Sequence, residues 1–308
     1  MAKRERFQEV QLELFIANAS DVRAKEVQEL MARSWFSISK SPRYEAIEHR
    51  VGDNSVVIES TSNKPIATIW DNDLLIFLIS QLVDGVNKGQ IDPTSHKQKR
   101  QIKFTGYEYF KFYQKRWRRG AVGQRTYQRL WDALERLHHT HITTDIRSPG
   151  GTGKMSKFYW LPFIEKTYDS DTQRQIGYEV EFPGWLYDQV MDQADSGNLV
   201  NVVSLDPNYF EITGGLERWL YLWCHKSYNP SIGSWEESFR SLHKKSGSSN
   251  TFSQFSRYLR GIIKRDTMLG YNLIETIVRG GPGLLVTRRE GHDLLMSPNE
   301  LKESVSDT

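Results

Sequence analysis

A helical alternation of hydrophobic and polar positions dominates the stretch 123–140. When these residues are placed on a helix at about 100° per residue, one side collects Tyr127, Leu130, Trp131, Leu134 and Leu137. The opposite side collects Arg125, Gln128, Arg129, Asp132 and Arg136. Such a helix can be anchored in a core while its polar side enters a DNA major groove, where Arg and Gln read base edges.

The same pattern returns in a second predicted helix over 251–269. Its apolar positions are Phe252, Phe255, Leu259 and Ile262, and they have the same intervals as Tyr127, Leu130, Leu134 and Leu137 of the first helix. Its opposite side carries Ser253, Arg257, Arg260 and Lys264. Each helix precedes a predicted hairpin, 141–147 with 154–163 and 271–278 with 284–289. Amphipathic helices commonly share this spacing, so the two hairpins are what favour an internal repeat.

The predicted elements follow one order in both halves. Short strands (34–40, 44–51, 55–60, 65–70) precede a buried helix over 71–89, capped by Asp71 or Asn72 and ended by Gly89. A strand over 99–105 and a helix over 106–117, capped by Thr105, come next. After a strand (177–182), a helix (183–191) and a strand-like segment (198–205), we predict helices over 214–226, 234–247 and 251–269. Ser234 with Glu237 would cap the middle one.

Helix, helix, turn, helix and hairpin in this order are typical of winged-helix domains. The fold class is therefore α+β, with two tandem winged-helix domains, each a helix-turn-helix plus a β-hairpin wing. The predicted organisation is an N-terminal arm at 1–33, a first domain with its connecting strand and helix at 34–195, a second at 196–290, and a flexible tail at 291–308. The arm, with a helix over 21–31, is a candidate oligomerisation element.

Composition places the chain among soluble globular proteins, at 38% hydrophobic and 26% charged residues. The apolar runs fall far short of a membrane span, and the N-terminus has no apolar signal core. A single cysteine, Cys224, permits no intramolecular disulfide and suits a reducing compartment. We therefore expect a cytoplasmic protein that does not bind membranes.

Positive charge is concentrated in one segment. The net charge is only +3, yet His96–Arg125 holds ten Lys or Arg residues and one acid, Glu108, a local excess of +9. Aromatic residues are interleaved with these cations. A solvated helix face would explain a charge run of this kind, but the run leads directly into the candidate reading helix. Its position favours a surface for the DNA phosphate backbone.

No pattern in the chain predicts catalysis, a cofactor or a bound metal. The segment 150–154 (GGTGK) resembles the end of a phosphate-binding P-loop, but Ser148 and Met155 stand where Gly and Ser/Thr are required. His138, His139 and His141 are expected to be solvent-exposed. An alternative is a metal-dependent rolling-circle nickase that uses the His139–His141 region and a tyrosine nucleophile. We expect a protein without enzymatic activity.

Several stretches together resemble one family of bacterial proteins. They are WFSISKSPR (35–43), 66–85 with ATIWDNDLLIF, 127–147, 209–226 with TGGLERWLY, SLHKKSGS (241–248) and FSRYLRGII (255–263). The chain is similar here to the plasmid replication initiator protein A family. The resemblance implies an initiator that binds DNA repeats at a plasmid origin through paired winged-helix domains. It also implies recruitment of host replication initiator and helicase proteins and, often, repression of its own promoter as a homodimer.

Helix faces, not family motifs, assign the individual contacts. The predicted base-reading residues on double-stranded DNA are Arg125, Gln128, Arg129, Asp132, Ser253, Gln254, Arg257 and Arg260. The predicted phosphate-binding residues are Lys111, Lys115, Arg116, Arg118, Arg119, Lys154, Lys264, Arg279 and Arg288. A winged-helix transcriptional regulator without a role in initiation is a further alternative, because fold alone does not give function.

Overall fold

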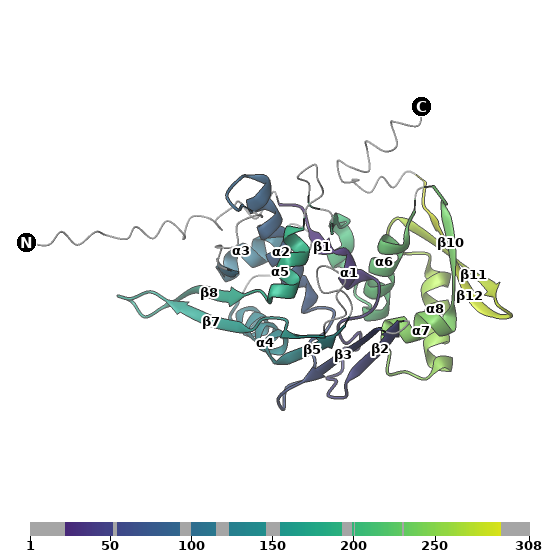
Figure 1. Cartoon of the computed structure of the whole chain (residues 1–308), viewed down its shortest axis with the longest axis horizontal. Helices are drawn as coiled ribbons and strands as arrows, with labels where there is room; N and C mark the ends of the chain where they lie inside the picture. Colours follow the sequence, from purple (N-terminus) through teal and green to yellow (C-terminus); the bar gives the residue numbers. More distant parts are fainter. Residues whose placement is uncertain are drawn as a thin grey trace, which may run out of the picture.

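The computed structural model describes residues 22–51, 54–92, 100–114, 123–145, 155–192, 199, 201–229 and 231–290 (Figure 1). The fold is α+β. The apolar residues buried in these ranges form one hydrophobic cluster that extends from Val22 to Val286. Both halves of the chain therefore share a core. Within the described ranges, no helix is both long and apolar enough to cross a membrane.

The first half is built on the buried helix α2 (Asn72–Asn87), which begins after Asp71 and ends before Gly89, as predicted. It is followed by β4 (Gln101–Phe104), α3 (Gly106–Gln114) and α4 (Gln124–His139). Strands β7 (Phe163–Tyr168) and β8 (Gln175–Glu181) form a hairpin, and β8 also pairs with β4, which gives the antiparallel order β4-β8-β7. Helix α5 (Gly184–Met191) follows.

The second half repeats this order around α6 (Gly215–Ser227). It continues with β10 (Ser234–Ser238), α7 (Phe239–Ser246), α8 (Phe252–Arg265), β11 (Tyr271–Val278) and β12 (Gly281–Arg288). Its antiparallel sheet has the order β10-β12-β11. We name α2, β4, α3, α4, β7 and β8 the first repeat unit, and α6, β10, α7, α8, β11 and β12 the second. The internal repeat predicted from the sequence is present.

Several predicted elements were wrong. The segment 234–247 is not one helix: its first residues form β10, because the Trp235 ring packs 6.0 Å from the Tyr271 ring and the strand pairs with β12. Helix α7 begins after its cap Ser238, whose hydroxyl accepts a hydrogen bond from the Ser241 amide at 3.2 Å. The hairpin of the first repeat unit is β7–β8 and not the strands predicted at 141–147 and 154–163.

Those two strands belong to a separate four-stranded sheet. Its order is β2 (Ile47–Val51), β3 (Asn54–Ser60), β5 (Thr140–Thr144) and β6 (Ser156–Tyr159), all antiparallel. In Figure 1, β5, β3 and β2 lie between α4 and α7. The predicted strands at 34–40 and 65–70 are reduced to one bridge between Ser37 and Thr68. This sheet therefore links the two repeat units.

Residues 22–33 are built into the core, which corrects the solvated arm expected for this part of the chain. Strand β1 (Lys25–Val27) pairs with β9 (Val202–Ser204), and the short helix α1 (Gln28–Met31) follows. The side chains of Val27, Leu30 and Met31 are buried because they pack into the shared apolar cluster. A 3₁₀ helix at Pro207–Glu211 leads from β9 to α6. The rest of the predicted arm and the predicted tail lie outside the described residues.

Candidate nucleic-acid interface

Helix α4 exposes its polar side at its N-terminal end. The side chains of Arg125, Gln128 and Arg129 are exposed there, whereas Leu130, Leu134 and Leu137 are buried. The amide of Gln128 donates a hydrogen bond to the Asp132 carboxylate at 2.8 Å. Gln128 and Asp132 are thus already paired with each other, and Arg125 and Arg129 are the cations that project most freely.

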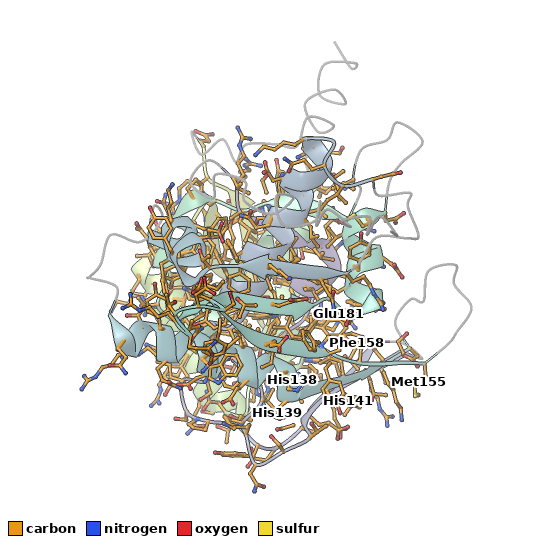
Figure 2. The ribbon with its side chains drawn as sticks, turned by 90° about the vertical axis from the view of Figure 1, so that its left-hand side faces the viewer. His138, His139, His141, Met155, Phe158 and Glu181 are labelled. Atoms are coloured by element: carbon orange, nitrogen blue, oxygen red, sulfur yellow. The ribbon has the colours of Figure 1, made fainter. Side chains whose placement is uncertain are left out.

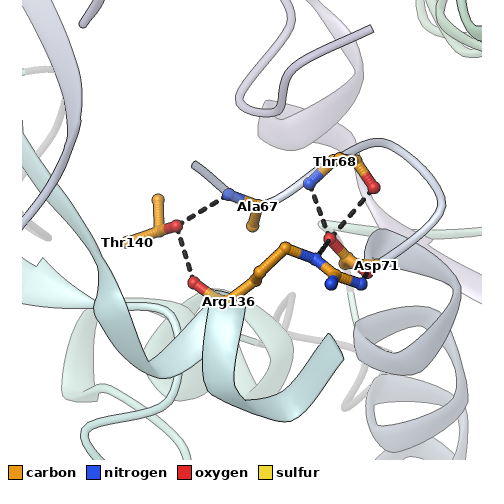
Figure 3. A network of polar contacts seen from close by, with 5 residues as sticks. All are labelled: Ala67, Thr68, Asp71, Arg136 and Thr140. Carbon is orange, nitrogen blue, oxygen red and sulfur yellow. Dashed lines mark hydrogen bonds and ion pairs between the residues drawn. The ribbon is translucent and has the colours of Figure 1, made fainter. Parts of the chain in front are cut away.

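The C-terminal end of the same polar side is used for anchoring (Figure 3). Arg136 donates from Nε and Nη2 to the Asp71 carboxylate at 2.8 and 2.6 Å, and these bonds raise the pKa of the guanidinium. Asp71 also accepts from the amide and hydroxyl of Thr68. The Thr140 hydroxyl donates to the Arg136 carbonyl and accepts from the Ala67 amide. Arg136 therefore fixes α4 against the start of α2.

Helix α8 has a stronger local start than α4. The Thr251 hydroxyl accepts from the Gln254 amide at 3.3 Å, and the Gln254 side chain accepts from the Thr251 amide at 3.2 Å, which completes a capping box. Ser253 and Arg257 are exposed. Arg260 is exposed as well, but its guanidinium forms a two-pronged pair with Glu275 of β11 at 2.8 and 2.9 Å. Of the four predicted readers, Ser253 and Arg257 are thus the least engaged.

The predicted phosphate-binding residues fall in different environments. Lys264 is exposed on α8, and Arg279 is exposed at the tip of the β11–β12 hairpin. Arg279 and Gly280 both have positive φ there, 52° and 75°, which suits a two-residue hairpin turn. The Arg288 guanidinium lies 4.8 Å from the centre of the Tyr228 ring, and the Lys111 ammonium lies 5.9 Å from that of Tyr107. Lys115, Arg116, Arg118, Arg119 and Lys154 lie outside the described residues.

Sequence reasoning missed the cations of the β7–β8 hairpin. Arg174 is exposed beside its turn, and the Lys166 ammonium lies 4.2 Å from the centre of the Trp131 ring on α4. This hairpin corresponds to β11–β12, so Arg174 has a place similar to that of Arg279. The alternation in FIEKTY (163–168) and QIGYEVE (175–181), separated by a turn rich in Asp, Ser and Thr, is the signal that could have revealed it.

The three histidines cluster at the end of α4 (Figure 2), and they are half-buried, not solvent-exposed as expected. His138 Nδ1 lies 2.8 Å from the Leu161 carbonyl, and His141 Nδ1 lies 3.3 Å from the Glu59 carboxylate. The His141 ring lies 5.1 Å from the ring of Tyr159. Among the described residues, no group of three or more His, Cys, Asp and Glu side chains has an arrangement that could hold a metal ion.

Comparison with known proteins decides the family. The family model described as replication initiator protein A matches residues 25–273. The chain belongs to the replication initiator protein A family. It is also 26% identical over 226 residues to a protein of Wigglesworthia glossinidia brevipalpis named "Putative replication protein", which covers 73% of this chain and 75% of that protein. Family membership gives the coarse function, which is the initiation of replication.

Solved structures with the same fold are those of domains 2 and 3 of RctB. Two crystal structures of these domains match with TM-scores of 0.52 and 0.57, at 13% and 12% identity, and both cover 85% of this chain and 98% of the RctB chain. At such low identity the likeness concerns the fold alone. It extends over both repeat units of this replication initiator.

The two segments that carry the family resemblance most specifically meet inside the initiator. Asp73, in the segment WDND, accepts a hydrogen bond from Arg218, in the segment GLERW, at 2.6 Å, and both side chains are only 2% exposed. Arg218 also donates to the Ile212 and Phe210 carbonyls. A side chain at Gly215 would place its Cβ 2.0 Å from the Ile38 carbonyl oxygen. These motifs therefore join α2 of one repeat unit to α6 of the other.

Proposed function

We propose that this initiator is a sequence-specific double-stranded DNA-binding protein made of two winged-helix units, which binds repeats at a plasmid origin. The observation that carries the proposal is the exposed polar side of the third helix in each repeat unit, α4 and α8. Both helices are followed, within their unit, by a two-stranded hairpin in the same sheet order. Each hairpin would serve as a wing beside the reading helix.

The contacts on DNA would come from the first two turns of each helix. Arg125 and Arg129 on α4, and Ser253 and Arg257 on α8, would read base edges. Gln128, Asp132, Gln254 and Arg260 would take part only after giving up the bonds that they make within the protein. Lys264, Arg279 and the tip residue Arg174 would hold phosphates and set the register of the complex.

The proposed initiator acts by binding and not by catalysis. It would recruit the host replication initiator and helicase to the origin, and a homodimer of the same chain would repress its own promoter. Family membership supports a role in replication, and the paired units support recognition of a site longer than one helix can read.

A matched pair of variants tests the reading helices. Arg129→Ala and Arg257→Ala should each weaken binding to the specific site by about 1–3 kcal/mol and relax sequence preference at different positions of it. Fluorescence anisotropy with systematically substituted duplexes measures both effects, and Lys88→Ala, an exposed lysine at the end of α2, is the control. If Arg129→Ala left affinity and preference unchanged, α4 would not be a reading helix.

A footprint on the DNA that flanks the gene separates the proposal from its alternatives. Regularly spaced direct repeats are expected for an initiator, whereas a single short palindrome would indicate a transcriptional regulator. Incubation of the protein with supercoiled plasmid and a divalent metal should leave the plasmid closed. A covalent tyrosyl–DNA product would instead establish the rolling-circle nickase.

A further inference from the structure

A basic cavity of about 690 Å³ lies where the N-terminal half of the chain meets the second repeat unit. It is formed by the end of α1, by β2, by the C-terminal end of α6 and by α7. Its five cations face a single acid, Glu48, and are Arg33, Arg50, Lys226, Lys244 and Lys245. No residue of α4 or α8 lines it. The volume is within the range of small-molecule sites, about 300–1,000 Å³.

Arg33 is the most unusual of these residues. It is only 9% exposed, and its Nε and Nη1 are buried without a hydrogen-bond partner among the described residues. The Glu29 carboxylate is 3.9 Å from Nη2, beyond hydrogen-bond distance. Burial lowers the pKa of the guanidinium. An under-paired buried cation is costly for folding because the charge loses its hydration there, so its presence points to a role other than stability.

The mouth of the cavity carries further positive charge. Arg50 and Lys244 are exposed and form no ion pair with a described residue. Lys226 donates to the Gln28 side chain, and Lys245 is already paired with Glu237. His49 bonds to the Ser34 carbonyl at 2.7 Å and so is committed to the protein itself. Arg50 and Lys244 at the mouth, and Arg33 below them, are therefore available to an anion.

We propose that this cavity is a binding site for a phosphate-bearing ligand that bridges the two halves of the initiator. Guanidinium and ammonium groups together match the charge and the acceptor geometry of phosphate. The buried Trp223 adds an apolar wall beside these cations. Two sources supply this chemistry, a free nucleotide and a phosphate of the DNA backbone.

Calorimetric titration of the full chain with ATP, ADP and inorganic pyrophosphate tests the free ligand. Saturable binding of at least one of them is expected, weakened at least about tenfold in an Arg50→Ala, Lys244→Ala double variant. Both positions are exposed, so the double variant should fold. Lys88→Ala is the control and should bind as the wild type does. This experiment needs no DNA, so its outcome is independent of the roles proposed for α4 and α8.

Titration of a DNA duplex against salt tests the second source. If the site takes a backbone phosphate, the double variant should lower the dependence of log K on log salt by about 2, with sequence preference unchanged. Binding of a free phosphate compound that the double variant weakens, or this change in slope, supports the site and identifies its ligand. If neither is observed, the proposal is overturned.

An Arg33→Met variant separates a binding role from a structural one. The thermal midpoint should stay the same or rise, because an under-paired buried charge is removed while much of the side-chain volume is kept. The affinity for whichever phosphate ligand binds the wild type should fall at least about tenfold. A lower midpoint with unchanged affinity would show that Arg33 supports the fold and not the ligand.

Discussion

The two repeat units hold equivalent helices in different ways. In the second unit, α8 ends at Arg265 and β11 begins at Tyr271, so helix and hairpin follow each other directly. In the first unit, β5 and β6 are inserted between α4 and β7 and join the four-stranded sheet. Helix α4 is thus held at its C-terminal end by this sheet and by the Arg136–Asp71 pair. Helix α8 relies on its apolar side, its capping box and the Arg260–Glu275 pair.

The contacts that hold α4 and α8 in place reduce the part of each helix that is available for recognition. In both units one arginine beyond the first two turns of the helix, Arg136 on α4 and Arg260 on α8, is paired with a carboxylate of the same protein. The N-terminal positions stay exposed in both. Since reading helices contact base edges with their N-terminal residues, the two units leave exposed the part of the helix that our proposal assigns to DNA, despite their different supports.

The largest expected effect concerns the bond that joins the units. Arg218→Met should lower the free energy of unfolding by about 3–5 kcal/mol, because it leaves the Asp73 carboxylate buried and unpaired. Urea denaturation followed by tryptophan fluorescence measures this loss. The Asp73→Leu, Arg218→Met double variant should recover part of it, since no buried charge remains. If the single variant unfolded as stably as the wild type, the two units would not depend on this pair.

The parts of the fold that depend on neighbours in sequence could be predicted. The Thr105 cap and the end of α7 at Gly247 are local signals, and both are confirmed. The cap predicted at Ser234 with Glu237 was wrong, because these residues lie in β10. The prediction misses the β7–β8 hairpin, because it runs a single strand (154–163) through the short break at 160–162. The pairing of β4 with β8 depends on contacts between residues that are far apart in the chain.

The candidate interface shows the same limit. The sequence predicts Arg129 and Arg136 on one side of α4, and helical spacing alone does not distinguish an arginine that is exposed from one that is paired. The partner of Arg136 is Asp71, 65 residues earlier, so only the folded chain shows that this arginine is occupied. Likewise the pairing of Arg260 with Glu275 depends on how β11 packs beside α8.

A buried acid of β1, Glu26, lies against the start of α2, and its burial predicts a pH effect. Glu26 is fully buried against Asn72, and burial raises its pKa from the ordinary 4.5 to about 8. The folded state keeps this proton up to about pH 8 while the unfolded state releases it near 4.5, so stability falls as pH rises through this window. At the start of α6, Glu217 is half-buried and bonds to Thr267.

Glu26→Gln should remove this contribution, because the amide does not titrate. The gain in unfolding free energy over the wild type should increase by about 1.4 kcal/mol for each pH unit between 5 and 7. Urea denaturation across that range measures it, with Glu45→Gln at an exposed position as the control. If the difference in unfolding free energy between Glu26→Gln and the wild type stayed constant from pH 5 to 7, Glu26 would not be protonated in the folded state.

The Arg260–Glu275 pair predicts a smaller effect on DNA binding that distinguishes α8 from α4. Arg260 is held by Glu275, so Arg260→Ala should weaken specific binding by under about 1 kcal/mol. This loss should be smaller than that of Arg257→Ala. Glu275→Gln should release the guanidinium and strengthen binding slightly. Anisotropy titrations at fixed salt measure all three variants. If Arg260→Ala lost as much affinity as Arg257→Ala, the pair would open on DNA and Arg260 would read bases.

The smallest expected effects lie at the hairpin tips of the two units. Arg174 and Arg279 are both exposed, and each is proposed to hold one phosphate. Arg174→Ala and Arg279→Ala should each weaken binding to all sequences alike and lower the salt slope by about 1. Equal changes in slope would show that β7–β8 serves the first unit as β11–β12 serves the second. A change for Arg279→Ala alone would mean that the first unit binds DNA without its hairpin, through α4 and the basic segment before it.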